Sequence, residues 1–399
     1  MGVMLLMTTS AASAPLEILE RILRYAAFGV LDVPSKSWRL RHFVDNNAVN
    51  AIRQIPLINR HWNEAATRIL YWKLDVNECR REGRSAILSR NALLTRTLEE
   101  SPRLQAHVHS LCLNAWTMDI NDREELEGSS VRILRCCPLV QHLWITGWIP
   151  SFLDDVHMTI TTFTRLRYLS VHSFSDYRDP FCSFERLEVM MNGWPNFEHL
   201  NLGGDVVTDD SGDSVRSAPK PPMKKHITRL ILSGPRSLEG FTYVVPNLVE
   251  LSLWTCEEPD LFLLYAQRWK RTLRCLKFRL GSATTEIEWQ AVMMALRGFE
   301  KLHQLRIRNH FPLTLLSLPD TLEKVKFTVR NIDLPILFDV LDQKLPHSIK
   351  TVVFGVEYLH AIHTENAQSD LEQELRAFCE KRHWKWLVYH PHRYRISTS

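Results

Sequence analysis

Apolar residues recur along this chain in groups of three, in which the second and third members follow the first by three and five positions. Residues 318–327 (LPDTLEKVKF) and 345–354 (LPHSIKTVVF) show this spacing after a Leu-Pro step. The group occurs ten times in chain order. The ten groups are Val108/Leu111/Leu113, Val140/Leu143/Ile145, Leu166/Leu169/Val171, Phe197/Leu200/Leu202, Ile227/Leu230/Leu232, Leu248/Leu251/Leu253, Leu273/Leu276/Phe278, Leu302/Leu305/Ile307, Leu322/Val325/Phe327 and Ile349/Val352/Phe354.

The second and third members of each group lie two residues apart, so a β-strand places both on one face while their neighbours face the other way. One such unit cannot enclose three large apolar side chains by itself, whereas stacked units bury them against each other. The groups begin every 20 to 32 residues, which is a solenoid period. We therefore predict an α/β fold in which these strands stack into a parallel sheet.

The segments between the strands are long enough to return over the other face of the sheet. Residues 257–270 and 285–299 have helical periodicity and predict two of these return segments. Residues 383–389 (HWKWLVY) alternate and predict a last, capping strand. Residues 203–225 have few apolar anchors, and we expect them to form a mobile insertion.

The N-terminal part of the chain has a different pattern. Residues 14–27 (APLEILERILRYAA) carry Pro15 at a first-turn position and predict a helix, and residues 52–74 predict a second helix that restarts at Pro56. The apolar residues of the first helix cover more than one stripe. A module of about 60 residues has only a marginal core. We therefore expect another surface to cover this module.

Two resemblances follow from these residues. Residues 14–75 resemble an F-box, through a Pro-x-Glu-Ile-Leu-x-x-Ile-Leu helix, a Leu-Ile-Asn-Arg-x-Trp helix and a Leu-Tyr-Trp exit. The segment 30–47 is longer than the usual connection of that family. Residues 104–390 resemble leucine-rich repeats, in which the sheet lines the concave face. In this family an Asn or Cys stands three residues after the last apolar residue of each strand. In this chain only Cys256 occupies such a position, which predicts an irregular solenoid.

The resemblance implies a substrate-recognition subunit, not itself catalytic, of an SCF-type (cullin-RING) E3 ubiquitin ligase. Its F-box docks on a Skp-type adaptor, and its repeats hold the protein client. The residues that the resemblance places at or behind the adaptor contact are Pro15, Leu16, Ile18, Leu19, Ile22, Leu23, Leu57, Ile58 and Trp62. In the alternative interpretation the N-terminal helices cap the solenoid against Val108 and Leu111, and the protein is a leucine-rich-repeat scaffold with no ubiquitin role.

The expected organisation has five parts. They are a disordered N-terminus (1–13), the F-box-like module (14–75), a helical linker (76–103), the solenoid with its insertion (104–390) and a C-terminal tail (391–399).

The residues that alternate with the buried strand positions should line the open face of the sheet. In the later strands many are cations, and adjacent parallel strands lie only about 4.8 Å apart, so like charges meet. We expect an acidic or phosphorylated client segment to bind there, with aromatic anchors from earlier strands. The predicted client-binding residues are Trp144, Tyr168, Trp254, Lys277, Arg279, Arg306, Arg308, Lys324 and Lys326. The alternative is a solvated strand face whose charges are paired by Asp and Glu residues from nearby loops.

Composition limits the other function classes. The 399-residue chain is 45% hydrophobic with a net charge of +4, which by itself does not imply a nucleic-acid partner. No apolar stretch is long enough for a membrane helix, and eight cysteines without metal-type spacing fit reduced thiols in the cytoplasm or nucleus. Because no nucleophile, phosphate-loop or zinc-protease motif is present, we expect no catalytic residues, cofactor or metal.

Overall fold

A computed structural model describes most of the chain. The described residues are 15–28, 60–76, 84–114, 120–148, 150–172, 180–203, 207–208, 226–232, 241, 245–254, 259–281, 284–307, 318–329, 338–339, 341–343, 345–356 and 365–389. The expectations for segments 1–13, 30–47 and 391–399 concern residues outside these ranges.

The fold is α/β, and it divides into two compact units. The first unit comprises Met1–Leu169 and Val189–Asn196, and the second comprises Ser170–Glu188 and Phe197–Ser399. In the first unit, parallel strands follow one another in chain order. These strands are β1 (Lys73–Val76), β2 (Ser110–Asn114) and β3 (His142–Thr146), and β4 (Tyr168–His172) spans the boundary between the units.

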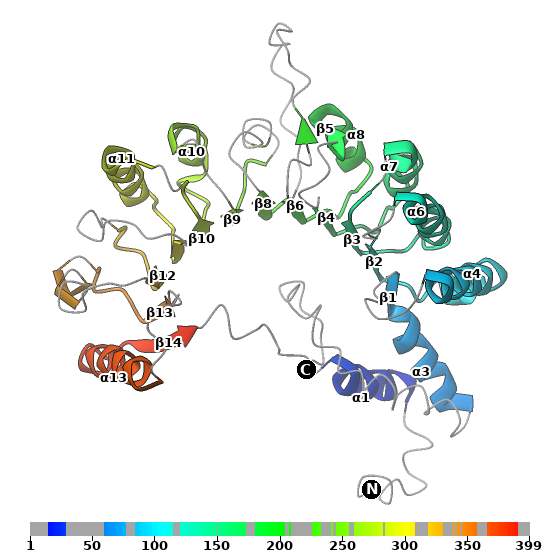
Figure 1. Ribbon diagram of the computed structural model, residues 1–399, viewed down its shortest axis with the longest axis horizontal. Coiled ribbons are helices and arrows are strands. Elements are labelled where there is room, and N and C mark those ends of the chain that lie inside the picture. The colour runs from blue at the N-terminus through cyan, green and yellow to red at the C-terminus, as the bar shows by residue number, and fades with distance from the viewer. Residues whose placement is uncertain are drawn as a thin grey trace, which may run out of the picture. The chain divides into compact units, whose positions relative to one another are not determined.

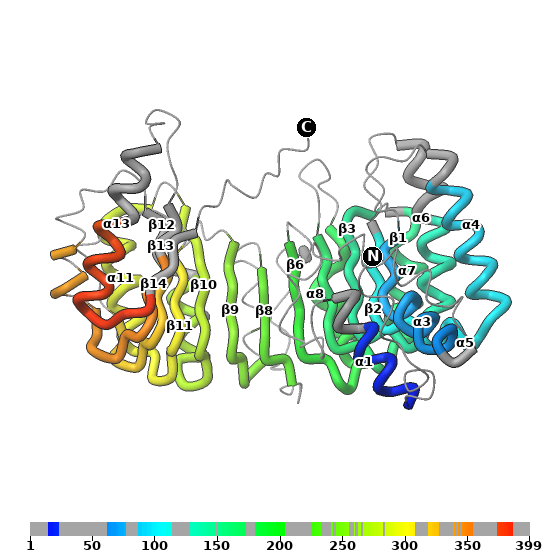
Figure 2. Tube along the Cα trace, turned by 90° about the horizontal axis from the view of Figure 1, so that it is seen from below, coloured from blue at the N-terminus to red at the C-terminus, as the bar shows by residue number. Residues whose placement is uncertain are grey.

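The second unit continues the same construction. Its parallel strands also follow chain order, and Figure 2 shows several of them side by side. They are β6 (His199–Gly203), β8 (Arg229–Leu232), β9 (Glu250–Leu253), β10 (Cys275–Phe278), β11 (Gln304–Ile307), β12 (Lys324–Val329), β13 (Thr351–Val356) and β14 (Lys385–Tyr389). The strand predicted over 383–389 is thus confirmed as β14, which pairs with β13.

Helices return between the strands. In Figure 1, α4, α6 and α7 lie on one side of the strands of the first unit, and α10 and α11 lie on one side of those of the second. A capping box between Thr285 and Glu288 fixes the start of α11. The helices are α1 (Leu16–Phe28), α3 (Arg60–Trp72), α4 (Arg84–Glu100), α5 (Pro102–Gln105), α6 (Ile120–Arg135), η4 (Pro150–Phe152), α7 (Leu153–Thr161), α8 (Phe184–Asn192), α10 (Pro259–Ala266), η5 (Gln267–Trp269), α11 (Glu286–Arg297) and α13 (Glu365–Lys381).

The register of the strands confirms the apolar pattern. Leu111 aligns with Leu143, and Leu230 aligns with Leu251, so the second members of neighbouring groups lie side by side. Every described side chain of the ten groups is at most 5% exposed. These ladders of apolar residues form the core between the sheet and its helices.

The structure contains strands that the sequence analysis did not predict. The parallel sheet begins at β1, before residue 104, because Leu74 pairs in register with Leu111. Tyr71, Leu74 and Val76 have the same three-and-five spacing, with a tyrosine in the first place. Within the expected insertion 203–225, Val207–Thr208 form strand β7, which pairs with β5 (Cys182–Ser183).

Candidate functional site

Helices α1 and α3 enclose a small core of their own. Leu19, Leu23 and Trp62 are 1%, 2% and 3% exposed. They pack with Ala65, Ala66 and Ile69, and Leu16 and Leu70 cover them in part. Leu19, Leu23 and Trp62, which were predicted to lie at or behind the adaptor contact, are therefore buried inside this helical pair.

The outer surface of α1 carries two large apolar side chains. Ile18 is 45% exposed and Ile22 is 48% exposed. They stand four residues apart, so they lie on one face of the helix. Pro15 is also exposed, and Leu16 is partly buried. Leu57 and Ile58, the other two predicted contact residues, lie outside the described residues.

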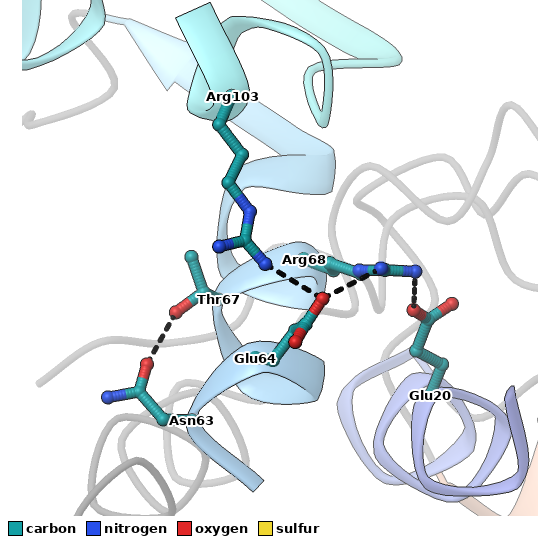
Figure 3. A network of polar contacts seen from close by, with 6 residues as sticks. All are labelled: Glu20, Asn63, Glu64, Thr67, Arg68 and Arg103. Carbon is teal, nitrogen blue, oxygen red and sulfur yellow. Dashed lines mark hydrogen bonds and ion pairs between the residues drawn. The ribbon is translucent and has the colours of Figure 1, made fainter. Parts of the chain in front are cut away.

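An ion-pair network holds the two helices together (Figure 3). The guanidinium of Arg68 on α3 lies 2.7 Å from the Glu20 carboxylate on α1 and 2.9 Å from Glu64. Arg103 on α5 also reaches Glu64, at 2.8 Å. The hydrogen bond from Arg68 lowers the pKa of the Glu64 carboxyl, and the charge of Arg103 adds to this effect. The network therefore joins α1 to α3 and α3 to α5.

Two of the predicted aromatic anchors are buried. Trp144 is 8% exposed and Tyr168 is 3% exposed. Their ring centroids lie 5.2 Å apart, and His142 lies 6.1 Å from Trp144 and 6.3 Å from Tyr168. Large rings on adjacent strands cover one another, so these side chains do not offer the exposed surface that we predicted. Trp254, the third anchor, is 41% exposed.

A polar cluster that the sequence analysis did not predict joins β4 to β6 within the second unit. The Ser170 hydroxyl lies 2.9 Å from Nε2 of His172, and the Asn201 amide donates to Ser170 Oγ at 2.9 Å. The same amide lies 3.1 Å from His172 Nε2. The sequence showed that these residues share a face, but not that their side chains converge.

This cluster lacks the access that nucleophilic catalysis needs. Ser170 is fully buried, so its hydroxyl cannot reach a substrate. Two cysteines outside this cluster, Cys137 and Cys182, are also poorly suited to act as nucleophiles. Burial raises the pKa of both thiols to about 12, which keeps them protonated at neutral pH. Over the part of the chain that the structure describes, no group of three His, Cys, Asp or Glu side chains could hold a metal ion. The cluster of Ser170, His172 and Asn201 is best understood as a buried polar network.

Replacing Gly203 with alanine should disturb this network. A Cβ atom on Gly203 would stand 2.1 Å from Nδ1 of His172, so the imidazole must leave its hydrogen bonds with Ser170 and Asn201. We expect Gly203→Ala to lower the free energy of unfolding by about 2 kcal/mol, measured by urea denaturation followed by circular dichroism. Adding His172→Ala should recover about 1 kcal/mol of the loss through removal of the clash. A strictly additive double variant would contradict this account.

Three of the predicted cations form a continuous row across the second unit. Lys277 on β10 aligns with Arg306 on β11, and Arg306 aligns with Lys326 on β12. We call Lys277, Arg306 and Lys326 the cationic row. Lys324 stands two residues before Lys326, on the same face of β12. The predicted adjacency is therefore confirmed for these residues.

The other two predicted cations, Arg279 and Arg308, are not part of the cationic row. Arg279 is exposed just beyond the end of β10, and Arg308 lies outside the described residues.

One carboxylate neutralises the edge of the cationic row. Glu250 on β9 forms ion pairs with Lys277 and with Arg229, the latter at 3.2 Å. The acidic partner comes from a neighbouring strand, whereas we had considered only acidic residues from nearby loops. At this edge Lys277 and Arg229 are thus paired within the protein, though by a strand residue rather than by a loop residue.

Fold and surfaces together define an α/β protein with a parallel sheet and two candidate binding surfaces, on α1 and on β10 to β12. A comparison with known protein families found no family model that matches the chain, and a comparison with curated proteins found no match. Among the described helices, none combines the length and apolar character that a membrane crossing requires.

Proposed function

We propose that this protein is the substrate-recognition subunit of an SCF-type ubiquitin ligase. In this proposal α1 and α3 belong to an F-box that docks on a Skp-type adaptor. The parallel strands belong to a leucine-rich-repeat solenoid that holds the client. The protein itself performs no chemistry.

The single observation that carries the proposal is the exposed Ile18–Ile22 pair beside the small core that α1 and α3 enclose. Leu19 and Leu23 bury themselves between α1 and α3, so the pair is not needed to close that core. A large aliphatic side chain contributes roughly 1.5 to 3 kcal/mol when it is fully buried. Covering the exposed half of both isoleucines with a partner would therefore contribute appreciably to binding.

The ion pairs within the first unit fit the same role. Arg68 and Arg103 join α1, α3 and α5 through Glu20 and Glu64. These contacts would keep the exposed face of α1 in a defined orientation on α3 and α5 when the adaptor binds.

A second candidate function is a repeat scaffold whose N-terminal helices form its cap. One observation favours it: α3 ends at Trp72 and β1 begins at Lys73, so the helical pair runs directly into the first strand. Such a cap would shield the sheet end without any adaptor. The two functions differ in whether a foreign protein covers Ile18 and Ile22.

Co-expression with a Skp-type adaptor tests the proposal. We expect the full chain and the adaptor to elute together from size-exclusion chromatography as an equimolar complex at micromolar concentrations. Protection of the α1 amides from hydrogen exchange should increase in the complex. Separate elution, with unchanged exchange in α1, would favour the scaffold instead.

A further inference from the structure

Helix α11 is apolar on the side that faces away from the core as well as on the side that faces it. Its buried residues are Trp289, Val292, Met293 and Leu296. On the opposite side, Ile287 is 79% exposed and Met294 is 61% exposed. These two residues are almost two helical turns apart in the chain, so they lie on one line of the surface. An outer helix normally carries polar residues on that line.

The other residues on this line are small. Ala291 lies between Ile287 and Met294, and Gly298, the C-cap residue, follows one turn after Met294. Ala291 is partly buried and Gly298 is exposed. We call Ile287, Ala291, Met294 and Gly298 the outer stripe of α11. Because the separation of two packed helices depends on the size of the side chains between them, the small residues let a second helix approach closely.

Helix α10 adds another apolar side chain to the surface of the second unit. The helices α10 and α11 lie next to each other (Figure 1), and Leu264 on α10 is 62% exposed. Single exposed apolar side chains are common on protein surfaces. Several of them along one helix and on the adjoining helix indicate an interaction surface.

The charged residues beside the outer stripe change sign along the helix. Glu286 lies in the first turn of α11 and Arg297 in the last, and both side chains are exposed. Helical geometry places them on the same flank of the stripe, only about 20° apart around the helix axis. Within the described part of the chain neither forms an ion pair, so both charges are available to a partner.

We infer that the outer stripe of α11 binds the same stripe of a second copy of this chain, with the two helices antiparallel. Such a contact has a two-fold axis, so every pairing occurs twice. With the axis beside Ala291, Ile287 of each copy packs against Met294 of the other. The same arrangement brings Glu286 within about one turn of Arg297 of the other copy, which these long side chains can span.

The charge pattern favours a second copy as the occupant, because α11 supplies both partners of each ion pair. The antiparallel arrangement also opposes the two helix dipoles favourably. A parallel pair would instead place Glu286 beside Glu286 and Arg297 beside Arg297. One helix face from each copy, even with Leu264, gives an interface at the small end of the range for specific complexes. We therefore expect a reversible dimer with a Kd of about 10 to 100 µM.

Sedimentation velocity with the full chain tests the inference. Between about 1 and 300 µM protein, the mean sedimentation coefficient should increase from that of a monomer towards that of a dimer. Ile287→Lys/Met294→Lys should weaken the dimer at least about 30-fold, because it places charges in the apolar contact. The control Leu93→Lys/Met158→Lys replaces two exposed apolar residues of the first unit and should change the Kd by less than about 3-fold.

Charge reversal tests the antiparallel geometry. Glu286→Arg and Arg297→Glu should each weaken the dimer about 10-fold, because each variant places like charges at both flanking contacts. In a parallel pair the unaltered chain would already do so, and neither variant would weaken it. An equimolar mixture of the two variants should recover dimers of the original strength, because every flanking contact again joins opposite charges.

Four results would overturn the inference. They are a monomer at every concentration, unchanged self-association of the charge variants, no recovery in their mixture, and loss of the dimer in Ile18→Lys/Ile22→Lys. The last result would show that a different surface forms the contact. The assay contains no adaptor, so its result does not depend on the proposed function.

Discussion

Replacing Ile18 and Ile22 together with lysine is expected to abolish adaptor binding while the protein stays folded. Both side chains are almost half exposed, so the free protein tolerates a charge at either position. In the complex the two ammonium groups would lie in an apolar contact, where an unpaired charge is strongly unfavourable. We expect at least about 300-fold weaker binding, which corresponds to losing two hot-spot contacts. Isothermal titration calorimetry with purified adaptor measures the change.

The matched control changes two exposed apolar residues elsewhere in the same unit. Leu93 and Met158 are 56% and 58% exposed on α4 and α7, and Leu93→Lys/Met158→Lys should bind the adaptor normally. The milder variant Ile18→Ala/Ile22→Ala keeps the helix neutral and should still weaken binding about 10-fold. Full binding by both α1 variants would refute the proposed contact. Leu19→Lys is a poor test, because Leu19 is only 1% exposed and its replacement would unfold the helical pair.

Replacing Trp269 with alanine is expected to cause the largest loss of stability. This side chain is fully buried, and its indole N–H donates to the Val245 carbonyl at 2.6 Å. The alanine variant leaves a large cavity and an unpaired carbonyl, so we expect a decrease of about 4 kcal/mol in the free energy of unfolding. Trp194 makes the equivalent bond to the Ile160 carbonyl, at 2.7 Å, in the first unit.

Graded variants separate the two contributions of Trp269. Trp269→Phe keeps most of the apolar volume but removes the donor, and it should cost about 2 kcal/mol. Trp254→Ala removes an indole that is 41% exposed and should cost about 0.5 kcal/mol. Urea denaturation followed by circular dichroism gives all three values. Equal costs for the alanine and phenylalanine variants of Trp269 would show that packing contributes little there.

The arrangement of the strands could be predicted from the sequence because it depends on a local period. Each apolar group predicts which residues face the core, and stacking of similar groups aligns their second members. Leu276 and Leu305, 29 positions apart in the chain, accordingly lie in register. The same reasoning placed Lys277 beside Arg306, because residues that follow aligned core positions must themselves align.

The exposure of side chains on the open face could not be predicted in this way. Trp144 and Tyr168 have the alternating position of surface residues, yet neighbouring rings bury them. The convergence of His172, Ser170 and Asn201 likewise depends on side-chain rotamers, and on the absence of a Cβ at Gly203. Alternation determines which face a residue occupies, but the size and shape of its neighbours determine how much solvent reaches it.

The sequence by itself therefore determined the parallel order of the strands, their core-facing residues and the row of cations, since each follows from a repeat that neighbouring residues share. Only the tertiary structure decided which of these residues are accessible. Leu19 and Leu23 close a core while Ile18 and Ile22, one position before each, remain exposed, and Glu250 neutralises Lys277 but comes from a different strand. The physical reason is that burial and ion pairing depend on contacts between segments far apart in the chain, which no local pattern encodes.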